Sequence, residues 1–219
     1  MKTEVRRERL EHPAIVRVCH WLVAIAIPVL AASGLEVFAA FPSFGDKVPE
    51  HVVFTPPDAV RLGGWLGGAL QWHFTFAWLL LGAGAVYAFY QLASGNYRQV
   101  LFVSRDVRGV WPMIGHYFLF EPKPAHVGTY NPLQKLAYTT AIGLSVVLVI
   151  TGLALYQPVQ LSWLVAALGG FRLVRVEHFA AMCGLAAFVP GHVVMVALHG
   201  WSNFASMWTG EVGSLKSEV

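Results

Sequence analysis

Charged side chains are scarce in this chain of 219 residues. Asp, Glu, Lys and Arg together make up 12% of the sequence, against about 25% in a typical soluble domain. Hydrophobic residues make up 56%, and the mean hydropathy is +0.57. The shortage of charge argues against a soluble domain, and the sequence holds no basic patch of the kind that binds a nucleic acid. The composition indicates an integral membrane protein.

Cysteine is also rare, with only Cys19 and Cys183 in the sequence. No CxxCH motif occurs, which excludes covalent haem attachment, and two isolated cysteines do not form a metal-binding spacing. We interpret both as small apolar packing residues. The sequence does not predict a cleavable signal peptide either, because acidic residues interrupt the basic N-terminal segment and no small-residue cleavage site follows a short apolar core.

Four apolar segments are long enough, at about 20 residues, to cross a bilayer. They cover residues 15–41, 66–92, 133–156 and 174–201. A further apolar stretch at 161–170 is too short to span and is expected to lie at the interface or to re-enter. The sequence therefore predicts a single all-α transmembrane domain over residues 1–219, built as a four-helix bundle.

The basic residues predict the orientation of this bundle. Most lie in the N-terminal segment, in the connection between the second and third spans, and in the tail: Lys2, Arg6, Arg7, Arg9, Arg17, Arg98, Arg105, Arg108, Lys123, Lys135 and Lys216. The opposite side has only Lys47, Arg61, Arg172 and Arg175. Because cytoplasmic loops carry the excess of Lys and Arg, both termini are predicted to be cytoplasmic.

Histidine is the titratable residue that the chain does contain, with nine copies, and four of them lie in the apolar spans: His20, His73, His178 and His192. A titratable ring in hydrocarbon is costly unless it is paired or bound. His178 and His192 are fourteen residues apart, which at about 100° per residue places them on one helix face, about 21 Å apart along the axis. The fourth span thus presents two imidazoles at two depths.

Pairs of imidazoles from neighbouring helices are the axial ligands that a haem iron takes in a helix bundle. The up-and-down order of the spans brings His73 near His178 towards the outer surface, and His20 near His192 towards the cytoplasm. The sequence therefore predicts a bundle that holds two haem b groups. His199 lies about 20° from His192 on the same face, and is an alternative inner ligand.

Two arginines adjoin the predicted ligands. Arg17 precedes His20 and Arg175 precedes His178, each by three residues. Both are candidates for pairing with haem propionates, and both are equally well explained as interfacial anchors whose charged ends reach water.

Two other classes of function fit part of the pattern. One is a stand-alone cytochrome that exchanges electrons between quinol and a soluble acceptor. The other is a transporter whose histidines relay protons. Ion pathways normally carry acidic or basic residues within the membrane, and none lies at the middle of the four spans, which disfavours the transporter.

Four motifs carry a resemblance to a known family. They are RVCHW at the first span, TYNPLQK before the third, the His178-x13-His192 spacing, and FASMWTG after the fourth. Together they resemble the cytochrome b (gamma) subunit of membrane-bound formate dehydrogenases, whose wider family includes the cytochrome b subunits of nickel–iron hydrogenases and thiosulfate reductases. The Tyr-Asn-x-x-Gln-Lys element favours the formate dehydrogenase type over the hydrogenase type.

The resemblance implies a multi-pass membrane-anchor subunit of a bacterial inner membrane, with no substrate-oxidising centre of its own. Electrons would come from a periplasmic iron–sulfur subunit, served by a molybdenum, tungsten or nickel–iron catalytic subunit, and would reduce menaquinone or ubiquinone near the cytoplasmic surface. Carried over to this sequence, the quinone residues are His192, Asn131 and Gln134, with Tyr130 and Lys135 as weaker candidates. Thr129 departs from the family, since a basic residue often stands there.

Overall fold

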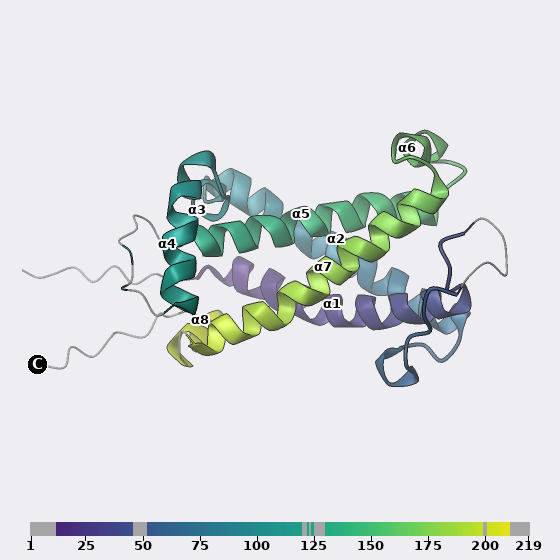
Figure 1. Cartoon of the computed structure of the whole chain (residues 1–219), viewed down its shortest axis with the longest axis horizontal. Coiled ribbons are helices and arrows are strands. Elements are labelled where there is room, and N and C mark those ends of the chain that lie inside the picture. Colours follow the sequence, from purple (N-terminus) through teal and green to yellow (C-terminus); the bar gives the residue numbers. More distant parts are fainter. Residues whose placement is uncertain are drawn as a thin grey trace, which may run out of the picture.

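Four long helices run the length of the molecule (Figure 1). They are α1 (Ala14–Ala40), α2 (Leu66–Ser94), α5 (Pro132–Tyr156) and α7 (Phe171–Leu198). The structure is a computed structural model, and it describes residues 12–45, 52–119, 122, 124, 130–198 and 201–210. Each long helix is long and apolar enough to cross a membrane. The four predicted spans are therefore confirmed, with ends that differ by a few residues from those predicted.

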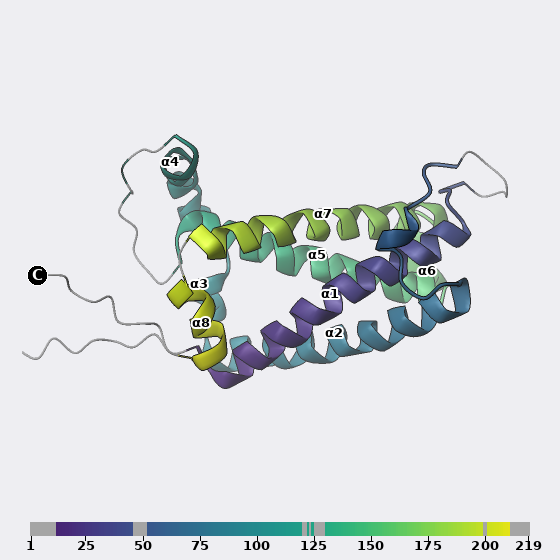
Figure 2. The same cartoon turned by 90° about the horizontal axis from the view of Figure 1, so that it is seen from below.

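The long helices are arranged as two close pairs. The closest backbone packing joins α1 to α2 and α5 to α7. Figure 2 shows α1 and α2 on one side of the bundle and α5 and α7 on the other. Contacts between the two pairs are therefore made mainly by side chains, and this is the interface across which the predicted histidines meet.

Short elements cover the two ends of the bundle. At one end, here called the α8 end, lie α3 (Tyr97–Val100), η2 (Ser104–Asp106), α4 (Val107–Phe118) and α8 (Trp201–Thr209). At the opposite end, the α6 end, lie α6 (Ser162–Ala167) and the segment of residues 52–65 with η1 (Asp58–Val60). The apolar stretch at 161–170 thus forms only a short helix outside the bundle, in agreement with the prediction that it does not span.

The outer faces of the long helices are apolar and exposed. Large side chains on these faces include Val18, Trp78, Phe89, Val146 and Val194, which are 58%, 61%, 74%, 52% and 56% exposed. Exposed apolar surface on this scale is unfavourable in water but suits a lipid environment. The chain is a multi-pass membrane protein.

The connection between α2 and α5 is bound to the start of α5. The Lys135 ammonium lies 3.2 Å from a carboxylate oxygen of Asp106, and the Phe102 amide donates to the Thr139 hydroxyl at 2.8 Å. Burial alone would raise the pKa of Asp106, but the Val103 amide and Lys135 stabilise the carboxylate, so the pKa lies below its ordinary value. The ion pair therefore persists at neutral pH. Sequence patterns did not predict the helices α3 and α4 of this connection.

The segment before α2 is bound to α1 at the α6 end. The Arg61 guanidinium lies 3.1 Å from the Glu36 carboxylate, and the Leu62 amide donates to the Ala32 carbonyl at 3.1 Å. Phe38, Phe44, Phe54 and Phe179 form a cluster of mutual ring contacts beside these bonds. This end of the bundle is thereby closed by aromatic side chains.

The two cysteines differ in their surroundings. Cys19 is buried, as a packing residue should be, whereas Cys183 is exposed on α7. The prediction of a packing role is therefore wrong for Cys183, because the four-helix arrangement leaves that side of α7 without a neighbouring helix. Both thiols are free.

Candidate functional site

At the α6 end, His73 of α2 and His178 of α7 face each other across the interface between the two helix pairs. Their ring centres lie 6.3 Å apart, with the ring planes at 63°. One ring comes from each pair, so the two helix pairs jointly build the site. This is the outer of the two histidine pairs that the sequence predicts.

A hydroxyl group from a neighbouring helix holds each of these rings. Ser33 Oγ of α1 lies 3.1 Å from Nδ1 of His73, and Thr151 Oγ1 of α5 lies 2.8 Å from Nδ1 of His178. Each hydroxyl also lies close to a carbonyl of its own helix, 2.7 Å for Ser33 to Val29 and 2.6 Å for Thr151 to Val147. The single hydroxyl hydrogen is used there, so the oxygen accepts a hydrogen bond from Nδ1–H.

The consequence is a defined tautomer. With hydrogen on Nδ1, the Nε2 of each imidazole keeps its lone pair, which is the form that binds a metal. Hydrogen bonds of this kind fix the orientation of a metal-binding histidine and raise its basicity. Ser33 and Thr151 are site residues that the sequence reasoning missed.

The glycine that follows each hydroxyl residue lets the ring approach. A Cβ at Gly34 would lie 3.3 Å from Cε1 of His73, and a Cβ at Gly152 would lie 3.3 Å from Cε1 of His178. These contacts are tighter than most Cβ contacts, so any larger residue would press on the imidazole. A signal for this arrangement exists in the sequence, since Ser-Gly-Leu in the first span and Thr-Gly-Leu in the third are matching tripeptides.

At the α8 end, His20 of α1 and His192 of α7 form the second pair. Their ring centres also lie 6.3 Å apart, with the ring planes at 57°. Aromatic side chains hold these rings instead of hydroxyl groups. The His192 ring is stacked on Phe188 at 5.5 Å, and the His20 ring meets the edge of Trp21 at 5.2 Å. Nδ1 of His20 is buried and has no hydrogen-bond partner among the described residues.

Helix α8 fixes the tryptophan beside His20. The Trp21 indole N–H donates to the Met207 carbonyl at 3.0 Å, and its ring lies 4.3 Å from the ring of Trp208. Arg17 donates to the Trp208 carbonyl as well. The start of α1 is thus attached to α8 directly beside the second histidine pair.

The geometry of both pairs fits an iron atom held between two imidazoles. Two metal–nitrogen bonds of about 2 Å each, with about 1.1 Å from each ring centre to its nitrogen, would separate the ring centres by about 6 Å. Within the described residues, no group of three or more His, Cys, Asp or Glu side chains is placed to hold a metal ion. Two axial ligands suit an iron whose other four positions are supplied by a porphyrin.

The two arginines predicted near propionates have backbone partners. Arg17 donates to the Trp208 carbonyl. Arg175 donates to the Phe41 carbonyl at 3.0 Å, and its guanidinium lies 4.6 Å from the centre of the Phe41 ring. Both are therefore built into the ends of the bundle, and their pairing with propionates stays a prediction.

Asn131 and Gln134 form the reciprocal cap that starts α5. The Gln134 amide donates to Oδ1 of Asn131 at 2.9 Å, and the Asn131 amide donates to Oε1 of Gln134 at 3.0 Å. Pro132 occupies the first turn, so the expected helix start is confirmed. Asn131 Nδ2 donates to the Tyr117 hydroxyl at 3.3 Å. The cap uses the carbonyl oxygens of both side chains, and the NH2 group of Gln134 is not part of it.

Further phenol and amide groups lie at the α8 end. Of these, the sequence analysis did not predict Tyr87 and Gln91 as site residues. The Gln91 amide donates to the Tyr87 hydroxyl at 2.6 Å, while Oε1 of Gln91 is buried with no hydrogen-bond partner among the described residues. Tyr130 packs against the ring of Tyr138 at 5.4 Å. Burial, with a smaller effect from Tyr87, raises the pKa of Tyr130, so its hydroxyl stays protonated and able to donate at neutral pH.

Several predicted residues stand outside these observations. His199, the alternative to His192, and Thr129 lie outside the described residues. Lys135, the weaker quinone candidate, is the partner of Asp106 in the ion pair described above. The structure brings His20 together with His192 and His73 together with His178.

Comparison with known proteins gives a consistent family. The family model described as "Prokaryotic cytochrome b561" matches residues 11–210. The chain is 38% identical over 187 residues to a "Putative protein-methionine-sulfoxide reductase subunit YedZ1" of Azospira oryzae, covering 85% of this chain and 90% of that protein.

More distant relatives carry a different description. The chain is 24% identical to a "Probable Ni/Fe-hydrogenase B-type cytochrome subunit" of Bradyrhizobium diazoefficiens, over 91% of this chain and 84% of that protein. It is 27% identical to a protein of the same description from Cupriavidus necator, over 83% of this chain and 76% of that protein.

Proposed function

This chain belongs to the prokaryotic cytochrome b561 family, and from that premise we propose that it is a di-haem membrane subunit that carries electrons between a partner oxidoreductase at the α6 end and membrane quinone at the α8 end. The observation that carries the proposal is the presence of two histidine pairs, each with ring centres 6.3 Å apart. A b-type haem, when bound, supplies one-electron chemistry at its iron.

The chain's own residues would set up both sites. His73 and His178 would hold one haem, with Ser33 and Thr151 fixing their tautomer. His20 and His192 would hold the other, oriented by stacking and edge contacts with aromatic rings. The apolar helix faces around both pairs exclude water, which favours electron transfer over side reactions.

The difference between the pairs supports a direction. Hydrogen bonds from Nδ1–H raise the basicity of His73 and His178, and a more basic ligand favours the higher oxidation state of iron. The α6-end site is therefore expected to have the lower midpoint potential, and electrons would run from the α6 end to the α8 end. The described basic residues support an α8 end in the cytoplasm: Arg17, Arg98, Arg105, Arg108 and Lys135 lie there.

The quinone site is proposed at the α8 end, close to the start of α5. The NH2 group of Gln134 and the hydroxyl of Tyr130 can donate to a quinone carbonyl, and the unpartnered Oε1 of Gln91 can accept from a quinol hydroxyl. Asn131 acts by holding the cap and by its bond to Tyr117. His192 joins this site as the ligand nearest the quinone.

The partner is proposed to be a periplasmic iron–sulfur protein with a metal-containing catalytic subunit. Hydrogenase cytochrome subunits among the relatives favour a nickel–iron partner, whereas the Tyr-Asn-x-x-Gln-Lys element favours a molybdenum or tungsten partner of the formate dehydrogenase type. Purification of the tagged chain from its native membranes under mild detergent separates these possibilities. Recovery of the chain with no iron–sulfur protein would instead support a stand-alone cytochrome.

A second candidate reverses the flow. The relative of 38% identity is described as a putative methionine-sulfoxide reductase subunit, and a reductase partner would take electrons from quinol through this chain. Redox titration distinguishes the two candidates, because outward flow is favoured if the α6-end site has the higher midpoint potential.

Replacing either Ser33 with Ala or Thr151 with Val should change the midpoint potential of the α6-end site only. Loss of one hydrogen bond of about 1 kcal/mol should raise its one-electron midpoint potential by about 40 mV. Potentiometric titration followed by optical and EPR spectra measures this change. Ser145→Ala is the matched control, because the Ser145 hydroxyl donates to the Ala141 carbonyl of its own helix at 2.8 Å, and it should leave both potentials unchanged.

The quinone site is tested by isosteric changes that preserve the cap. Gln134→Glu keeps the oxygen that accepts from Asn131 but removes the NH2 donor, and should slow reoxidation of the reduced cytochrome by quinone about tenfold. Asn131→Asp keeps Oδ1 but removes the donor to Tyr117, and should have a smaller effect. Stopped-flow spectroscopy in nanodiscs measures both rates. An unchanged rate in Gln134→Glu would remove Gln134 from the site.

A further inference from the structure

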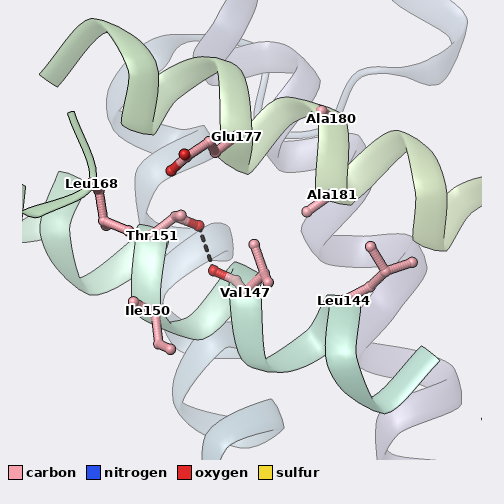
Figure 3. Close-up of a pocket in the computed structure, with 8 residues that line it drawn as sticks. All are labelled: Leu144, Val147, Ile150, Thr151, Leu168, Glu177, Ala180 and Ala181. Carbon is pink, nitrogen blue, oxygen red and sulfur yellow. Dashed lines mark hydrogen bonds between the residues drawn. The ribbon is translucent and has the colours of Figure 1, made fainter. Parts of the chain in front are cut away.

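A groove of about 460 Å³ lies between α5 and α7 on the outside of the bundle (Figure 3). Its walls are apolar apart from Thr151 and Glu177, and include Leu144, Val147, Ile150 and Leu168. Val147 and Ile150 are 40% and 38% exposed, so the groove opens towards lipid. Its volume lies within the range of small-molecule sites, about 300–1,000 Å³.

The groove contains a carboxyl oxygen that has no hydrogen-bond partner within the part of the chain that the structure describes. Figure 3 shows Glu177 directed from α7 into the groove, towards the level of Thr151 and Leu168. Oε2 of Glu177 is buried and has no hydrogen-bond partner among the described residues. Buried polar atoms are nearly always hydrogen-bonded, and an acidic residue within a membrane-spanning helix is costly to keep. Glu177 therefore indicates a ligand that brings a hydrogen-bond donor.

The other polar group of the groove offers no donor. The Thr151 hydroxyl lies 2.6 Å from the Val147 carbonyl, to which it donates, and 2.8 Å from Nδ1 of His178, from which it accepts. A carboxyl group has an acceptor oxygen in either protonation state. The site thus favours a ligand that donates a hydrogen bond, as a ring hydroxyl does.

We propose that this groove binds the ring of a membrane quinol, with one ring hydroxyl donating to Glu177 and the isoprenoid tail lying along Val147 and Leu144. A flat ring with a lipid-soluble tail matches an apolar groove that opens to the bilayer and has one acceptor at its α6 end. The proposal rests on the proposed function, since it makes this groove a second quinone-type site, at the opposite end from the one near Gln134. Thr151 links it to the outer histidine pair, because the same hydroxyl lines the groove and orients His178.

Photolabelling locates the ligand directly. The full chain with its haems is placed in phosphatidylcholine nanodiscs, whose headgroup carries no hydrogen-bond donor, and is illuminated with an azido-ubiquinol kept reduced. Peptide mass spectrometry should find label within residues 144–151 and 177–181. Glu177→Leu should reduce that label about tenfold, as expected for one lost hydrogen bond, while Glu177→Gln, which keeps an acceptor, should retain it.

Two further variants separate occupation of the groove from loss of folding. Ala180 is exposed and lines the groove, so Ala180→Trp should block labelling by filling it. Ala187 is exposed on the same face of α7 about two turns away, and Ala187→Trp is the matched control that should label normally. The haem spectrum and the label near residues 130–138 should be unchanged in every variant.

Several results would overturn the proposal. Wild-type label absent from the groove, or unchanged label in Glu177→Leu, would show that Glu177 does not bind the ring. Displacement of the label by added phosphatidylethanolamine, whose ammonium can donate, would assign the groove to a lipid headgroup. Loss of label near residues 130–138 with the groove still labelled would count against the proposed quinone-reducing site alone, so the two proposals fail separately.

Discussion

Replacing His178 with alanine is expected to reduce the haem content from two per chain to one. The remaining haem should be the one held by His20 and His192, because the second pair lies at the other end of α7 and shares no side chain with the first. Removal of His178 leaves one imidazole instead of two at this pair, which weakens the hold on the iron, and we expect this haem to be lost during purification. Pyridine haemochrome quantification per polypeptide measures the change.

Spectra identify which haem is lost. In a potentiometric titration, the haem whose midpoint potential Ser33→Ala leaves unchanged should remain in the His178→Ala variant. The haem whose midpoint potential Ser33→Ala raises should be missing from it. His116→Ala is a suitable control, because His116 lies in α4, outside the spans, and both haems should remain. Equal loss of both haems in His178→Ala would contradict the model of two independent sites. Absence of b-type absorbance from the unmodified chain would refute the proposed function as a whole.

Replacing His192 with alanine is expected to remove the α8-end haem and to slow quinone reduction about 100-fold. Mutation of a group that only orients a metal ligand typically costs about 10–100-fold in metal affinity or activity, so loss of the ligand itself should reach the upper end of that range, and here the lost site is the one beside the proposed quinone. The prediction rests on the position of His192, whose ring lies 6.3 Å from the ring of His20 and is stacked on Phe188, whereas His199 lies outside the described residues. The α6-end haem should remain in this variant.

The matched control is His199→Ala, which should keep two haems and a near-normal rate. Haem content and stopped-flow reoxidation by a short-chain quinone are measured on both variants side by side. The opposite pattern, with haem lost in His199→Ala and kept in His192→Ala, would transfer the ligand role to His199 and show that the last turn of α7 adopts another arrangement in the assembled protein.

Much of the fold follows from the sequence, because lipid imposes strong rules. About 20 apolar residues are needed to cross the bilayer, and every span must satisfy its own backbone as a helix. The four spans could therefore be predicted with small errors at their ends. Helix α4 could not, because an interfacial helix such as Val107–Phe118 has mixed polarity and contains Pro112, which makes it resemble a loop.

The histidine pairing was predictable for a related reason. Helical periodicity places His178 and His192 on one face, and the up-and-down order of spans assigns each a partner at the same depth. Neither the periodicity nor the order of the spans depends on side-chain contacts. The structure brings together the same two pairs, while the roles of these residues as haem ligands remain predictions for the variants above.

Only the tertiary structure decided what surrounds the rings. Ser33 is forty residues from His73 in the sequence, and Thr151 is twenty-seven residues from His178. Each bond joins two helices whose relative rotation depends on packing, and the periodicity of a single helix carries no information about it. The same holds for the attachment of Trp21 to α8 and for the groove beside Glu177.

The sequence by itself determined that this is a four-span membrane protein with imidazoles at two depths, because hydrocarbon selects strongly for apolar length and against unpaired polar rings. The tertiary structure decided which hydroxyl, glycine and aromatic side chains hold those imidazoles. It also showed that one pair has hydrogen-bond partners and that Nδ1 of His20 lacks one among the described residues. The physical reason is that hydrogen bonds and ring contacts depend on distances of a few ångströms between separate helices, which only their packing sets.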